Sequence, residues 1–154
     1  MSSEIKVDTI SEKTSANGVT IDSVSLKDGA VVGAAFTDYV ETDVAVTSGA
    51  TLAIDLANGN TGSVTLAHNV TDIDFTNVPA NGVSSFTLKA TQDGTGSRTM
   101  AINAVTVNGG SHATAKTPGA AGLTLSTGAN DVDLLTFLFF DAGTPLLNSL
   151  LDFS

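Results

Sequence analysis

The chain has no cysteine and no tryptophan among its 154 residues, and only three prolines. Without cysteine it can form neither disulfide bonds nor thiolate metal sites. Basic residues are also scarce: the chain has 6 Lys and Arg against 16 Asp and Glu, which gives a net charge of −10. So acidic a chain repels phosphate backbones and anionic lipids. We therefore expect neither nucleic acid nor a membrane among its partners.

Charged residues of either sign make up only 14% of the chain, whereas 42% is hydrophobic. An ordinary soluble domain is roughly 25% charged, so little here keeps apolar faces and strand edges of different molecules apart. This composition predicts an oligomer. The apolar run LLTFLFF at 134–140 is too short to cross a bilayer, which takes about 20 residues. The first residues, MSSEIKVDT, lack the basic and apolar regions of a secretory signal, so we expect none.

Turn-forming dipeptides recur along the chain and separate short segments of alternating apolar residues. The dipeptides are Asn17-Gly18, Asp28-Gly29, Asn58-Gly59, Asn81-Gly82, Asp93-Gly94 and Asn108-Gly109. The segments span 51–56, 63–66, 72–75, 85–90, 99–102 and 105–107, with a closing strand over 144–153. Such dipeptides favour two-residue hairpins, and regular short strands are typical of sandwiches and barrels. We therefore predict an all-β fold whose domain, residues 43–154, is an antiparallel, jelly-roll-like β-sandwich.

The first 42 residues differ from this domain. Their apolar positions come in twos and threes, too few to bury a core of their own against the entropy of ordering the segment. We predict an extended β arm over 1–42 that trimerises or attaches to a neighbour, with the acidic stretch 37–43 as its junction. The predicted contact residues of the arm are Ile5, Val7, Ile10, Val19, Ile21, Val24 and Leu26.

The run at 134–140 contains three aromatic residues, Phe137, Phe139 and Phe140. Its simplest interpretation is a central strand buried on both faces. Seven consecutive apolar or β-branched positions nevertheless exceed what one core face can bury. The alternative is a strand that is half core and half subunit interface, and we predict these three phenylalanines as interface residues.

Residues suited to chemistry are few. The pairs Asp72/Asp74 and Asp131/Asp133 place two carboxylates on one face of a strand, which could hold Ca²⁺ or flank a glycosidic bond. The simpler interpretation is a solvated polar face opposite an apolar one. His68 and His112 lack metal-ligand spacing, so we expect exposed loop histidines. The glycine-rich stretch 93–99 lacks the remainder of a phosphate-binding motif and is predicted to be a hairpin loop. We predict no catalytic, cofactor or metal residue.

The segment 7–29, VDTISEKTSANGVTIDSVSLKDG, resembles a stretch common in structural proteins of tailed bacteriophages, written V-D-T-I-x-E-x-T-x-x-x-G-V-T-I-D-G-V-x-x-K-D-G. Ser23 stands where that pattern has its second glycine. From residue 59 onward the chain is similar to the small β domains that close such proteins. In those domains an aromatic residue, often tryptophan, follows the stretch matching 133–144, whereas here Pro145 follows.

The resemblance implies an exterior virion protein, homotrimeric and without enzymatic activity. The role it favours is a capsid decoration, or cement, protein whose arm lies along the phage major capsid protein. The alternative is a short tail or head fibre whose outer domain binds a host surface glycan. A carbohydrate-active enzyme using one of the aspartate pairs is the third hypothesis. The chain has one arm and one domain, whereas fibres tend to be long and repetitive, so its size favours the cement role.

Overall fold

The computed structural model describes residues 39–154, and Val40–Ser154 form one compact unit. The predicted arm, residues 1–42, therefore lies outside the described part except for its last four residues. The first strand begins at Asp43. All structural statements below refer to residues 39–154.

The unit consists of eight strands and two 3₁₀ turns. They are β1 (Asp43–Ala45), β2 (Thr51–Asp55), η2 (Leu56–Asn58), β3 (Thr61–Leu66), β4 (Asp72–Thr76), β5 (Val83–Gln92), β6 (Val105–Val107), η3 (Pro118–Ala120), β7 (Val132–Phe140) and β8 (Leu146–Phe153). One sheet has the order β1-β3-β5-β7-β8, and the other has the order β2-β4-β6. The prediction of an all-β fold is confirmed.

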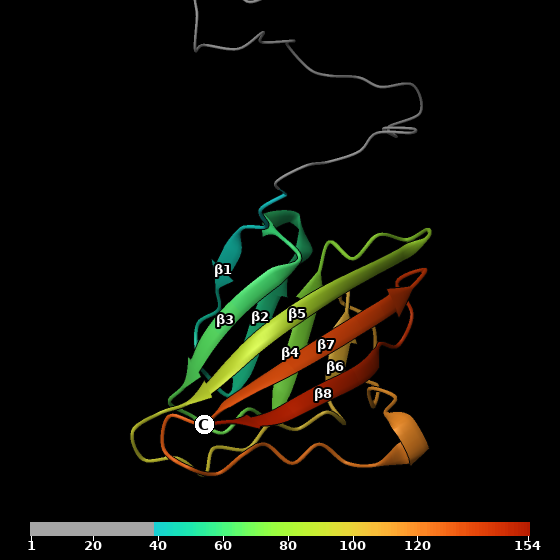
Figure 1. The fold of residues 1–154 in the computed structure, drawn as a ribbon. Helices are drawn as coiled ribbons and strands as arrows, with labels where there is room; N and C mark the ends of the chain where they lie inside the picture. Colours follow the sequence, from blue (N-terminus) through green and yellow to red (C-terminus); the bar gives the residue numbers. More distant parts are fainter. Residues whose placement is uncertain (1–38) are drawn as a thin grey trace, which may run out of the picture. The chain divides into compact units, whose positions relative to one another are not determined.

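Up to β6 the chain winds as a flattened coil, because successive strands alternate between the two sheets (Figure 1). Strands β1, β3 and β5 pair in parallel in the larger sheet, and β2, β4 and β6 do so in the smaller. The predicted antiparallel, jelly-roll-like arrangement is therefore wrong for the first six strands. Only β7 and β8 follow it, since β5–β7 and β7–β8 pair antiparallel.

Within residues 39–154 the turn dipeptides mark real chain turns, but three of the four do not close hairpins, and only Asn108-Gly109 is followed by a short antiparallel bridge, between Val105 and Ala113. Asn58-Gly59, for example, closes η2 with the Gly59 N–H donating to the Leu56 carbonyl, and the chain then crosses to the other sheet. Dihedral preference fixes where a chain turns, but not which strand it pairs with afterwards. The predicted strand at 99–102 is also wrong, because only Met100 forms an isolated bridge, with Val70.

Phenylalanine rings join the two sheets through one core. Phe75 on β4 lies 6.2 Å from Phe86 on β5, and 5.0 Å and 4.9 Å from Phe137 and Phe139 on β7, measured between ring centroids. All four rings are fully buried. Tilted and edge-on pairs at such distances each stabilise by about 0.5–1.5 kcal/mol beyond the burial of their area.

Gly62 on β3 allows the sheet to lie close to this ring cluster. A Cβ at Gly62 would come within 2.7 Å of Cζ of Phe86 and 2.8 Å of the Val44 carbonyl oxygen. Both distances are shorter than any real Cβ contact, so only glycine fits between the ring and β1 here.

Candidate functional site

The predicted site residues fall into three groups. The arm residues Ile5 to Leu26 lie outside the described residues. Phe137 and Phe139 belong to the core, with no exposed surface, whereas Phe140 is 51% exposed. The interpretation of 134–140 as a strand buried on both faces is wrong, because β7 alternates between buried and partly exposed positions. Of the predicted interface residues, Phe140 alone is available to another chain.

Phe140 belongs to an apolar face on the outer side of the larger sheet. Strand register places its members in adjoining pairs: Val83 beside Phe140, Leu138 beside Leu146, Leu134 beside Leu150 and Val132 beside Phe153. We call these eight residues the outer apolar face. Five of them are large and strongly exposed: Val83 (60%), Phe140 (51%), Leu146 (42%), Leu150 (56%) and Phe153 (51%). Exposed apolar side chains grouped on one sheet face mark an interaction site more often than a lone exposed side chain does.

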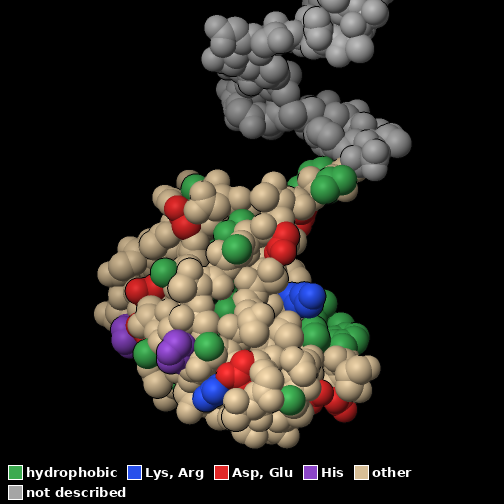
Figure 2. Space-filling view, turned by 90° about the vertical axis from the view of Figure 1, so that its left-hand side faces the viewer, with side chains coloured by type: hydrophobic (Ala, Val, Ile, Leu, Met, Phe, Trp, Pro, Cys, Tyr) green, Lys and Arg blue, Asp and Glu red, His purple; other side chains and the backbone are tan. Residues whose placement is uncertain are grey.

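The polar residues that cross and flank this face within the sheet are mostly uncharged, whereas the exposed Asp141 follows Phe140 and the exposed Asp152 precedes Phe153. A row of Thr87, Thr136 and Asn148 crosses it, and serine and threonine occupy the outward positions of β3 and the remaining ones of β5. Lys89, beside Leu134, is the one charged residue at the outward positions of β5 and β7. In the space-filling view, hydrophobic side chains gather at the right-hand edge next to a basic one (Figure 2).

Sequence reasoning identified one residue of this face and missed the others. The closing strand at 144–153 was expected, but the exposure of its leucines was not. The available signal was the doubled pattern Leu146-Leu147 and Leu150-Leu151, since a strand with apolar residues on both faces has a second surface to cover. Only the pairing of β8 with β7 shows that these leucines adjoin Phe140, Leu138 and Leu134.

Asp72 and Asp74 lie on the solvent-facing side of β4, as predicted, because Ile73 and Phe75 between and after them are buried. One oxygen of Asp72, Oδ1, is buried and has no hydrogen-bond partner within the described part. No group of three or more His, Asp or Glu side chains in residues 39–154 is arranged to hold a metal ion.

The second aspartate pair does not share a polar face. Asp133 is 1% exposed, so its predicted place on a solvated surface is wrong. Its Oδ2 accepts from the Ser126 backbone N–H at 2.9 Å, and its Oδ1 accepts from the Ser126 hydroxyl at 2.6 Å and from the Asp152 N–H at 3.1 Å. Asp131 instead accepts from the Gly128 N–H. Asp133 fastens the loop before β7 and the end of β8, which is a structural role.

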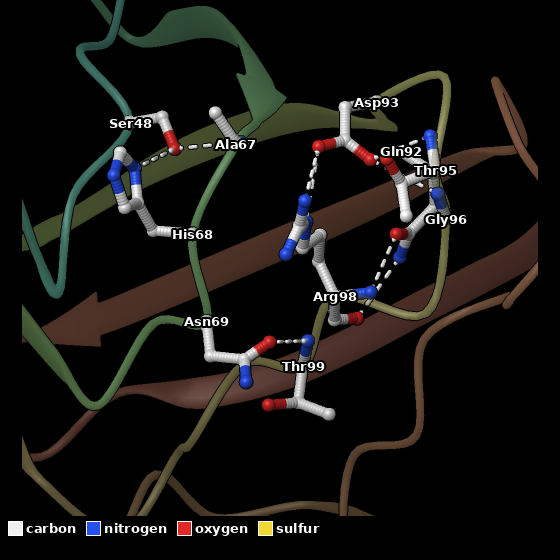
Figure 3. Close-up of polar contacts among 10 residues, drawn as sticks. All are labelled: Ser48, Ala67, His68, Asn69, Gln92, Asp93, Thr95, Gly96, Arg98 and Thr99. Carbon is white, nitrogen blue, oxygen red and sulfur yellow. Dashed lines mark hydrogen bonds and ion pairs between the residues drawn. The ribbon is translucent and has the colours of Figure 1, made fainter.

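The loop at 93–99 is held by its own polar contacts (Figure 3). Oδ2 of Asp93 accepts from Nε and Nη2 of Arg98 at 3.0 and 2.6 Å, and Oδ1 accepts from the Thr95 and Gly96 N–H groups. The side-chain hydrogen bond from Arg98 holds the pKa of the Asp93 carboxyl below its usual 3.8. The buried Gln92 amide also bonds the Arg98 backbone in both directions. The predicted hairpin is wrong, because the loop joins strands of different sheets.

Both histidines are exposed, as predicted. Nδ1 of His68 lies 3.5 Å from Oγ of Ser48, and that hydroxyl also accepts from the Ala67 N–H (Figure 3). These contacts fasten the turn between β3 and β4.

No family model, no curated protein and no solved structure matches the chain. In the part of the chain that the structure describes, no helix is long and apolar enough to span a membrane.

Proposed function

We propose that the protein is a non-enzymatic structural component of a tailed-bacteriophage virion, located on the exterior of the capsid. In this proposal it is a homotrimer that decorates the shell. The arm of residues 1–42 lies along major capsid subunits, and the two-sheet domain, a β-sandwich wound in parallel, projects outward.

The resemblance of residues 7–29 to the phage segment supports the virion role. The outer apolar face supports a role in assembly, and it is the one structural observation on which the proposal depends. Five large side chains between 42% and 60% exposed lie together on one sheet face of a strongly acidic chain. Such a surface suits contact with protein better than contact with a polar sugar or nucleic acid.

The mechanism requires binding alone. A protein that binds the assembled shell but not its dissociated subunits stabilises the shell by mass action, in proportion to its affinity and concentration. Arms that span the joints between capsid subunits add apolar and strand-edge contacts that must break before the shell opens.

Quantitative mass spectrometry of purified particles tests the role. A decoration protein is present in many copies per virion and a fibre in few, while absence from particles contradicts both hypotheses. Ile10→Asp or Ile21→Asp should abolish attachment while leaving the domain of residues 43–154 folded, because a carboxylate would be buried without a partner. Normal particle binding by both variants would contradict the role of the arm.

A further inference from the structure

We propose that the outer apolar face is covered by a second copy of this chain. The inference concerns the domain alone and does not require the virion role. It assigns Val83, Phe140, Leu146, Leu150 and Phe153 to a subunit interface, with the less exposed Leu134, Leu138 and Val132 beside them.

The area of the face fits such an interface. About half of each of the five side chains is exposed. An aromatic side chain buries roughly 150–250 Å² and a valine or leucine roughly 60–120 Å², so together the exposed parts offer on the order of 300 Å². A standard interface buries about 800 Å² per partner, of which roughly 56–65% is apolar. The five side chains therefore supply more than half of the apolar part of one standard interface, and the serine and threonine rim supplies polar area.

Charge favours a second copy over a partner of opposite charge. A basic partner would be drawn to the acidic surfaces of this chain and would find no carboxylate among the eight residues of the face. Two copies with a net charge of −10 repel each other, so they approach best where acidic side chains are missing. The eight residues of the face satisfy that condition, and a second copy presents the same eight uncharged side chains, with the acidic Asp141 and Asp152 only at the two ends of the face.

The layout of the face is also self-complementary, so two copies can meet through it in a two-fold contact. Such a contact is separate from the trimer of the proposed function, whose contacts the arm of residues 1–42 supplies. The row of Thr87, Thr136 and Asn148 divides it into two apolar groups of four residues each. When two such faces meet, the apolar groups can cover one another while the central row finds hydroxyl and amide partners in the other copy. Hydrogen bonds between the two rows would satisfy polar groups that the contact buries.

Cross-linking tests the contact directly, and the absence of native cysteine gives a clean background. Leu150→Cys places a thiol on the face, and Asn103→Cys places one at an exposed position just before β6 of the smaller sheet, as a control outside the face and its rim. With a short bismaleimide, full-length Leu150→Cys should form covalent dimers at least tenfold faster than Asn103→Cys. Equal rates, or a wild-type chain that sediments as a 15.5 kDa monomer across a concentration series, would overturn the inference.

A charge substitution separates this inference from the proposed function. Leu150→Asp should weaken self-association at least tenfold, and Asn103→Asp should not, because only the former buries an unpartnered carboxylate. If the wild type is a monomer and Leu150→Asp loses binding to phage particles, the face belongs to the capsid contact and the inference fails while the virion role stands. If copies cross-link through Leu150 but no particle captures the protein, the virion role fails and the inference stands.

Discussion

Replacing Asp133 by asparagine tests whether its hydrogen bonds outweigh the cost of burying its charge. The carboxylate is 1% exposed and accepts three hydrogen bonds, two from Ser126 and one from the Asp152 N–H. Asparagine offers one oxygen and one NH₂ group. With its oxygen at the Oδ1 position it keeps two of these bonds, but its NH₂ then faces the Ser126 N–H, donor against donor.

The expected loss follows from that geometry. One hydrogen bond to a charged group contributes about 1.5–3 kcal/mol, and a buried donor left unsatisfied costs about 1–3 kcal/mol. Relief of the buried charge offsets part of this sum, because a carboxylate is costly to desolvate. We expect Asp133→Asn to lower the free energy of unfolding by about 2–4 kcal/mol.

Urea unfolding followed by far-UV circular dichroism measures this change, since the chain has no tryptophan to report by fluorescence. With an m-value of about 2 kcal/mol/M, the midpoint should fall by roughly 1–2 M. Asp74→Asn, on the solvent-facing side of β4, is the matched control and should change stability by less than about 0.5 kcal/mol. An Asp133→Asn variant as stable as the wild type, or more stable, would show that desolvation dominates and would refute the reasoning.

Two further predictions concern packing and pH. Gly62→Ala should lower the free energy of unfolding by about 1–3 kcal/mol, because the new Cβ would lie 2.7 Å from the Phe86 ring. Gly94→Ala is the control and should leave stability unchanged, because no atom lies within 4 Å of its Cβ. Equal urea midpoints for the two variants would contradict this reasoning. The pKa of Asp93 is lowered from 3.8 by Arg98, so its contribution to stability is present above about pH 4 and is lost as the pH falls through the lowered value. The stability gap between the wild type and Asp93→Asn should therefore narrow below pH 3.8 in acid unfolding curves, and a constant gap would argue against the pairing.

The sequence predicted the strands better than their partners. In a half-buried strand every second residue is buried, and this pattern can be read from the local sequence. The buried positions Leu52, Ile54, Ile73 and Phe75 were therefore predicted correctly. Pairing is not local. A turn of the same type can end in a hairpin or lead to the other sheet, and which occurs depends on the total burial that each arrangement achieves.

The candidate site shows the same limit. Phe140 was predicted as an interface residue from one run of apolar letters, but Phe137 and Phe139 in that run fill the core. Alternate residues of β7 point to opposite faces of the sheet, so Phe137 and Phe139 point one way and Phe140 the other. Which set is buried depends on which face packs against Phe75. The same uncertainty applies to Asp133, because the alternating pattern does not show which face it points to. Its hydrogen-bond partners lie in the preceding loop and at the end of β8, and the sequence does not show that these segments come together.

Strand β5 has a consequence for how the chain is made. It is flanked by β3 in one direction and by β7 in the other, yet β7 begins only at Val132. During synthesis the wound part can therefore assemble first while one edge of β5 stays unpaired, with Phe86 and Leu88 lacking their β7 neighbours Phe137 and Leu135. Parallel pairing across long connections is slow, and unpaired strand edges promote aggregation in that interval. A chaperone that covers the open edge of β5 until Val132–Phe140 has emerged would protect the nascent chain at its most vulnerable stage.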